Sequence, residues 1–302
     1  MAKHVNTITV TGTLTSADLN TAPSKNTGRD MVRGNLVINT GTVDAPNEVK
    51  VNVLQMADKK DKKNEGQMIP DSRYNDLIKL TDPEAIGTKI SVSGSIDNNV
   101  FVPTGGDLVK GTSLSGGFYN IPGTGRDQAS FRMTMVIKSV KPEVDREENE
   151  TGSYIVQGIG FTFRNVAIPV KFYVDSPEGI GYFTSNKFLT AVEDGGVYTD
   201  VWGKIVNEQV APKTEESAFG DAYEVSSNAS FSRRVITGTA VKHHNKGTAE
   251  DPNDFTKFNA MVKEANEAYQ VLIAEAIERS EKPASAPASA PASKPVSGGF
   301  NF

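Results

Sequence analysis

Cationic and aromatic side chains alternate with apolar ones along several short runs in the second half of the chain. In one such run, Lys171 and Tyr173 alternate with Val170 and Phe172. Because successive side chains of a strand point to opposite faces, we expect the cations and rings on an outer face. That chemistry suits a single nucleic-acid strand, since cations neutralise phosphates and each stacked base contributes about 1–3 kcal/mol. The expected residues are Arg132, Lys138, Arg164, Lys171, Tyr173, Trp202 and Lys204, extended on the last strand by Arg233 and Arg234.

The first half of the chain carries fewer residues of this kind. Arg33 and Lys50 are expected to point outward, and Tyr74 and Phe101 are the aromatic residues that accompany them. This half is therefore expected to contact phosphates with little stacking. Two alternatives stay open. Trp202, the only tryptophan, could be an anchor of the core, and scattered Lys and Arg are normal on the outer face of any sheet.

Charge and composition restrict the kind of site that the chain can carry. The 302 residues include 32 Lys and Arg against 37 Asp and Glu, which gives a net charge of −5. Since phosphate binding depends on Lys and Arg, a polyanion site must be a local stripe on an otherwise acidic molecule. The chain has no cysteine, which excludes disulfides, thiolate nucleophiles and cysteine-bound zinc. No apolar run is long enough for a membrane span, so we expect a cytoplasmic protein, in the host cell if it is phage-encoded.

Signatures of catalysis are missing from the sequence. There is no phosphate-binding loop, dinucleotide glycine fingerprint, zinc-binding His-Glu-x-x-His or Gly-x-Ser-x-Gly elbow. His243 and His244 are adjacent and would point to opposite faces, which makes a poor metal site. The acidic run 143–150 has no apolar neighbours and is expected to be a solvated loop. We therefore expect no catalytic residues, no metal, no cofactor and no enzymatic activity.

Short alternating runs dominate the first 244 residues and predict a mainly β protein. Each half follows one order, in which three strands precede a helix and two strands follow it. The predicted helices cover 74–80 and 182–192, and a turn at Asn98 and Asn99 is expected to separate two paired strands. This order matches the OB-fold, a five-stranded Greek-key barrel. We expect two OB-like barrels in tandem, at 1–110 and 111–248, and a β-sandwich or an irregular viral-type β domain is the alternative.

The last part of the chain has a different composition. Residues 252–281, within a segment 249–282, are expected to form an amphipathic helix with an apolar seam at heptad spacing. That helix would either fold back on the β core or pair with a second subunit. Residues 283–302 carry Pro at every fourth position up to Pro295, which predicts a flexible tail. Its tip, with Phe300 and Phe302, either enters a partner's pocket or has no role.

The whole pattern resembles bacteriophage single-stranded DNA-binding proteins. The resemblance lies in the strand-rich OB-like core, the Pro/Ala/Ser linker after Lys282 and the final Phe302. It implies a protein that coats single-stranded DNA largely without sequence preference during replication or recombination, with a tip that recruits replication or recombination proteins. The tip here lacks the acidic residues of the bacterial relatives, so only Phe302 matches it. The competing hypothesis is a structural β protein of the virion or its assembly, and the residues do not separate DNA from RNA.

Overall fold

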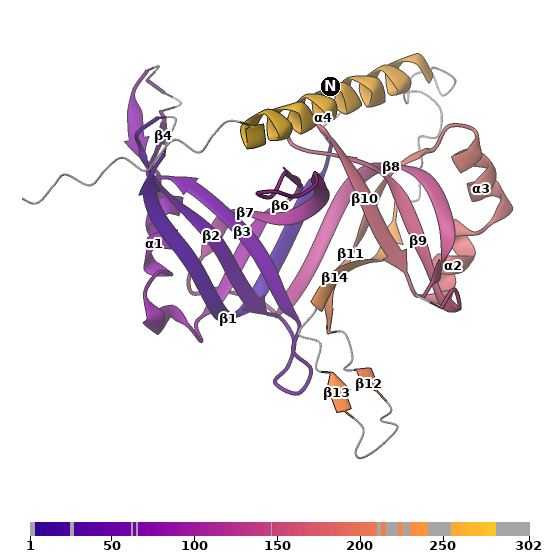
Figure 1. Ribbon diagram of the computed structural model, residues 1–302, viewed down its shortest axis with the longest axis horizontal. Helices are drawn as coiled ribbons and strands as arrows, with labels where there is room; N and C mark the ends of the chain where they lie inside the picture. The colour runs from indigo at the N-terminus through magenta and orange to yellow at the C-terminus, as the bar shows by residue number, and fades with distance from the viewer. Residues whose placement is uncertain are drawn as a thin grey trace, which may run out of the picture.

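The computed structural model describes residues 4–281 except 25–26, 62, 65, 146, 210–212, 216–222, 226–229 and 241–254. Two β-barrels lie side by side, and a long C-terminal helix lies across them (Figure 1). The tail 283–302, with Phe300 and Phe302, falls outside the described residues, as do His243, His244 and the expected helix start at 251–254. None of the described helices is long and apolar enough to span a membrane.

The first barrel closes around five strands. They are β1 (Asn6–Pro23), β2 (Asp30–Asn39), β3 (Glu48–Met56), β6 (Lys89–Phe101) and β7 (Val109–Asn120). They pair in the order β1-β2-β3-β7-β6, and β6 returns to β1; only the β3–β7 pair is parallel. The helix α1 (Ser72–Lys79) stands between the third and fourth of these strands, as an OB-fold requires. A small hairpin, β4 (Asp58–Lys60) with β5 (Met68–Pro70), precedes α1, and the 3₁₀ turn η1 (Pro83–Ala85) follows it.

The second barrel repeats this topology. Its strands are β8 (Gln128–Val144), β9 (Glu150–Phe161), β10 (Ala167–Val174), β11 (Val197–Gln209) and β14 (Ser230–Thr239). The order β8-β9-β10-β14-β11 closes through the β11–β8 pair, and β10–β14 is the parallel pair. Two short helices, α2 (Pro177–Phe183) and α3 (Asn186–Glu193), stand where the first barrel has α1, and β12 (Lys213–Glu215) pairs with β13 (Tyr223–Val225). The expectation of two tandem OB-folds in a mainly β protein is confirmed.

Two boundaries differ from those expected from the sequence. The first barrel runs to Asn120 rather than to 110, because β7 pairs with both β6 and β3 and closes that barrel. The turn expected at Asn98 and Asn99 is absent, since β6 continues through both residues to Phe101. Asn98 donates from Nδ2 to the Ala167 carbonyl of the second barrel at 2.9 Å. The β6–β7 hairpin is therefore longer than predicted and reaches the neighbouring barrel.

The core of each barrel follows from the alternation of its strands. Ile8, Val10 and Leu14 on β1 are buried, as the pattern predicted. In the second barrel, the rings of Phe131 and Phe172 stack with centroids 4.8 Å apart. Burial of large apolar side chains at about 1.5–3 kcal/mol each is the main force that holds such a core.

The first strands of the two barrels pair with each other. β1 and β8 run antiparallel with Asn6 opposite Met133 and Thr11 opposite Gln128. A single ten-stranded sheet therefore passes through both barrels. On another side of the joint, Asn47 donates to the Ile205 carbonyl at 3.0 Å and accepts from the Asn207 amide at 2.7 Å. These bonds give the two barrels a defined relative orientation.

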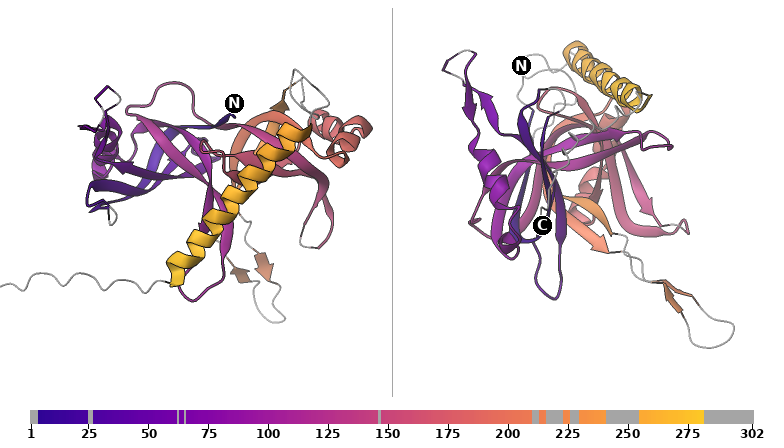
Figure 2. Two further views of the ribbon diagram at one scale, coloured as in Figure 1. Left: turned by 90° about the horizontal axis from the view of Figure 1, so that it is seen from above. Right: turned by 60° about the vertical axis from the view of Figure 1, so that its left-hand side comes forward.

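The C-terminal helix α4 (Phe255–Glu281) spans the two barrels, as Figures 1 and 2 show. Its buried residues Ala265, Tyr269 and Ile273 pack with Val136, Phe161 and Ala167 of the second barrel. The helix thus folds back on the β core, as one of the two interpretations of its seam predicted. The buried side of α4 differs slightly from the expected heptad seam. That seam contained Leu272, but in the structure Ile273 is buried and Leu272 is only partly buried.

Candidate nucleic-acid interface

One group of expected residues meets on the outer face of β10 and β14. The Arg233 guanidinium carbon lies 4.1 Å from the centroid of the Tyr173 ring, and the Lys171 ammonium lies 5.0 Å from it. Tyr173 is level with Val235 of the parallel strand β14, which places Arg233 beside Lys171. Both cations are within the distance at which a ring attracts a positive charge. The strand register therefore brings together residues more than 60 positions apart in the sequence.

A second group lies on β8 and β11. Trp202 is opposite Arg132 in the antiparallel register, and the Arg132 guanidinium carbon lies 6.0 Å from the indole. On its other side, Trp202 is opposite Gly238 of β14, where any side chain would clash with the indole. Trp202 keeps 39% of its surface exposed. It is thus an outer-face residue, and the alternative of a core anchor is wrong.

Lys204 connects these two groups. It follows Trp202 on the same face of β11 and is opposite Val235, the residue level with Tyr173. The two groups and Lys204 together comprise six residues on neighbouring strands of one barrel wall. We call them the second-barrel face: Arg132, Lys171, Tyr173, Trp202, Lys204 and Arg233.

Carboxylates pair with three of the four cations of this face. Arg132 bonds Asp200 at 2.8 Å, Arg233 bonds Glu143 at 2.8 Å, and the Lys204 ammonium is 4.0 Å from Asp175. Lys171 has no carboxylate partner among the described residues. The pairs hold the guanidinium groups in place but reduce the local positive charge. A phosphate must therefore compete with a carboxylate for most of these cations.

Three expected residues, Lys138, Arg164 and Arg234, lie away from the second-barrel face. Lys138 is on the outer side of β8, but it is six residues from Arg132, or about 20 Å along the strand. It donates to the Gly195 carbonyl, and partial burial lowers its pKa. Arg164 is in the turn between β9 and β10 rather than on a strand, so it does not share the face of Lys171. The ring of Phe163 in that turn is 95% exposed.

Arg234 does not extend the outer face beside Arg233. Neighbouring residues of a strand point to opposite sides, and Arg234 is only 9% exposed. Its Nη1 donates to the hydroxyl of Thr112 on β7 at 2.8 Å, and its Nε has no hydrogen-bond partner. Burial lowers the pKa of Arg234 to about 10. Its position at the junction of the barrels indicates a contact between them rather than a contact with solvent.

The first barrel carries Arg33 and Lys50 on the outer side of β2 and β3. Arg33 is opposite Leu54, and Lys50 is opposite Val37. Both cations are exposed, and Leu54 is 61% exposed, but no aromatic ring shares these positions. Of the two aromatic residues expected to accompany them, Tyr74 packs partly buried against the core and Phe101 ends β6. The expectation of cations with little stacking describes this part of the barrel.

The sequence did not reveal a third combination of ring and cation. Phe118 on β7 is 65% exposed, and the guanidinium carbon of Arg73 lies 5.4 Å from its centroid. The two residues are 45 positions apart, so no local pattern joins them. The sequence contains one signal for this site: Phe118 and Tyr119 are neighbours on a strand, so one of the two rings must point outward.

The structure is similar to the wild-type single-stranded DNA binding protein from Thermus aquaticus, with 12% identity, a TM-score of 0.48, and coverage of 83% of this chain and 98% of that one. A deletion mutant of the same Thermus aquaticus protein gives 13% identity, a TM-score of 0.46, and coverage of 83% and 100%. A Replication Protein A heterotrimer bound to ssDNA gives 11% identity, a TM-score of 0.18, and coverage of 86% and 69%.

No curated protein matches the sequence. The model of one protein family, described as YorF, matches residues 4–276 and so includes both barrels and most of α4. On that match, the chain belongs to the YorF family.

Proposed function

We propose that the protein binds single-stranded DNA, largely without sequence preference, through the second-barrel face. The observation that carries this proposal is the direct contact of cations with exposed or half-buried rings. Arg233 and Lys171 lie over Tyr173, and Arg132 lies over Trp202. Bases stack on such rings while the adjoining cations hold phosphates. In OB-folds the face of the second and third strands commonly binds oligonucleotides, and Lys171 and Tyr173 lie on β10, the third strand of this barrel.

The same chemistry accounts for a preference for single strands. Stacking on Tyr173 or Trp202 needs an open base face, which a duplex keeps inside its own stack. Stacking also accepts every base, because each has a π-face. In this proposal the protein is a binding protein and not an enzyme.

The carboxylates on this face set the expected strength of binding. Asp200, Glu143 and Asp175 hold their cations until a phosphate replaces them. Phosphate contacts depend strongly on salt, since each releases counterions from the DNA. We therefore expect tight binding at low salt and a steep loss as salt increases.

The biological setting that we propose is the replication or recombination of phage DNA in the host cytoplasm. It is supported by the Pro/Ala/Ser linker after Lys282 and by Phe302, which resemble those of phage single-stranded DNA-binding proteins. In this setting Phe300 and Phe302 bind a replication or recombination protein, and the outer side of α4 is available for self-association. Detection of the protein in purified virions instead of infected cytoplasm would favour the structural, virion role.

A fluorescence-anisotropy titration with labelled oligo-dT tests the proposal. The Tyr173→Ala and Trp202→Ala variants should each weaken binding by about 5- to 100-fold at low salt, which corresponds to one lost stacked base. Phe163→Ala is the matched control, because it removes an exposed ring outside the second-barrel face. A wild-type protein that does not bind at low salt would refute the proposal, and so would two ring variants that bind as tightly as the control.

A further inference from the structure

We infer that Phe118 and Arg73 on the first barrel form a second base-stacking site for the same DNA strand, reached over the paired strands of the two barrels. This inference rests on the proposed function and assigns to the first barrel a stacking role that Arg33 and Lys50 do not supply. It is carried by three features: the exposed ring, a fixed guanidinium beside it, and the continuous row of side chains that leads to it.

Phe118 is placed as a binding residue rather than as a core residue. It is opposite Ser93 on the outer side of the β6–β7 pair, while its neighbour Tyr119 is opposite Val92 in the core. An isolated Phe that is 65% exposed gives up the stabilisation that burial would supply. The Arg73 guanidinium carbon lies 5.4 Å from the centroid of the Phe118 ring. Phe118 and Arg73 thus combine a ring with a cation, as the groups around Tyr173 and Trp202 do on the second barrel.

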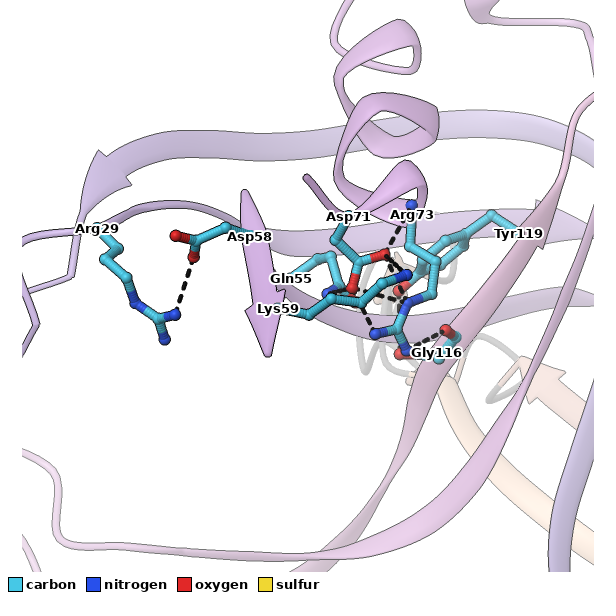
Figure 3. A network of polar contacts seen from close by, with 9 residues as sticks. Arg29, Gln55, Asp58, Lys59, Asp71, Arg73, Gly116 and Tyr119 are labelled. Carbon is cyan, nitrogen blue, oxygen red and sulfur yellow. Dashed lines mark hydrogen bonds and ion pairs between the residues drawn. The ribbon is translucent and has the colours of Figure 1, made fainter. Parts of the chain in front are cut away.

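Asp71 fixes Arg73 in this position, as Figure 3 shows. Its buried carboxylate accepts from Nη2 of Arg73 at 2.6 Å and from Nε at 3.0 Å, while Nη1 donates to the Gly117 carbonyl at 3.4 Å. Asp71 also accepts from Gln55 at 3.0 Å and lies 3.5 Å from the Lys59 ammonium. Asp71 is thus a positioning residue, which lowers the entropy that Arg73 loses when a ligand binds.

A row of directly opposed residues joins Phe118 to the second-barrel face. The row consists of Phe118 on β7, Ser93 on β6, Thr9 on β1, Ser130 on β8 and Lys204 on β11. Each of these residues lies directly opposite the next one. Opposed residues of a sheet point to the same side. At about 4.8 Å per strand, Phe118 and Lys204 are about 19 Å apart.

The middle of this row favours a nucleic-acid strand over a second copy of the chain. Its three residues are Ser93, Thr9 and Ser130, whose hydroxyl groups donate to phosphates and base edges without repelling them. Next to them, Thr7 is opposite Arg132, which is opposite Trp202. The core of a stable subunit interface is apolar, and these positions are not. Cations and rings at both ends with hydroxyls between them match a single strand.

The test uses the full-length chain, with Phe118→Ala as the variant and Phe163→Ala as the matched exposed-ring control. A labelled oligo-dT of roughly 30 nucleotides covers both barrels, since one OB-fold takes about 4–16 nucleotides. Phe118→Ala should weaken binding of this oligonucleotide by about 5- to 100-fold. Quenching of Trp202 by the same oligonucleotide at saturation should remain, because the second-barrel face is unchanged. Phe163→Ala should bind as the wild type does.

Three results would overturn the inference. The first is wild-type affinity of Phe118→Ala for the long oligonucleotide, and the second is an equal loss in Phe163→Ala. The third is a changed subunit number for Phe118→Ala in sedimentation with unchanged DNA affinity, which would assign the surface to a second copy. All three results require a wild-type protein that binds DNA. A wild-type protein that does not bind would refute the proposed function instead, so failure of the inference and failure of the proposed function can be distinguished.

Discussion

Replacement of Asp200 by Asn should strengthen DNA binding. Asp200 is the carboxylate partner of Arg132, with Oδ2 2.8 Å from Nη2, and its Oδ1 accepts from the Thr134 hydroxyl at 2.6 Å. An amide at this position can still accept from Thr134, but it no longer carries the charge that neutralises Arg132. One more cation of the second-barrel face then becomes available to a phosphate.

The size of the effect follows from counterion release. Each phosphate that a single strand gives to a cation adds about 0.7 to the slope of log K against log salt. If the variant and the wild type converge at about 1 M salt, one added contact gives about eightfold tighter binding at 50 mM. At 200 mM the advantage falls to about threefold. The increased slope distinguishes this mechanism from a change in stacking, which depends little on salt.

Anisotropy titrations with oligo-dT at several salt concentrations measure both quantities. Glu275→Gln is the control, because it makes the same change of charge at a helical pair, where Glu275 is 3.9 Å from Arg279 on α4. That variant should gain little, since neither residue belongs to a proposed DNA-binding site. Equal affinity and slope for Asp200→Asn and the wild type would refute the reasoning, and an equal gain in Glu275→Gln would show that only net charge matters.

Three further predictions concern stability. The pKa of Asp71 is lowered to about 2, mainly by its hydrogen bonds with Arg73, so its contribution of about 2 kcal/mol is present above pH 4 and is lost toward pH 2. Urea unfolding of Asp71→Asn should lack that part of the pH dependence, and an unchanged profile would contradict the assignment. Tyr269→Ala should lower the free energy of unfolding by about 3 kcal/mol, because Tyr269 is on the buried side of α4 and packs against the second barrel. An unchanged urea midpoint would show that the helix does not pack there. Arg234→Met should leave the melting temperature unchanged or higher, since it removes a buried cation that has no carboxylate among the described residues; a loss above about 2 kcal/mol would contradict this.

The barrels were predictable from the sequence because their strands alternate clearly. Residues such as Ile8, Val10 and Leu14 repeat every second position, and their burial follows from that period. The position of a helix between the third and fourth strands then selected the OB-fold. The pairing of β1 with β8 was not predictable, because neither strand carries a residue that specifies its partner.

Boundaries were less predictable, for reasons that particular residues illustrate. Asn98 and Asn99 favour a turn locally, but the bond from Asn98 to Ala167 and the pairing of β6 with β7 keep the strand extended. Phe163 fits the apolar side of β9 by parity, but the chain turns at 162–165 and leaves its ring exposed. In both cases tertiary contacts or a turn override the local pattern.

The candidate site was predictable only as a set of residue types on strand faces. Alternation placed Lys171, Tyr173, Trp202 and Lys204 outward, as the structure has them. It did not show that Arg234 would be covered by the other barrel. The Arg73 and Phe118 pair needs the barrel topology, because β7 and the first turn of α1 meet only after folding.

The emission of Trp202, the single tryptophan, gives the most direct test of DNA binding by the second-barrel face. Addition of unlabelled oligo-dT at low salt should quench this emission as a base stacks on the indole, and added salt should restore it. Emission that stays constant while anisotropy reports bound DNA would move the binding site away from this face. Constant emission with no binding at any salt concentration would contradict the account as a whole.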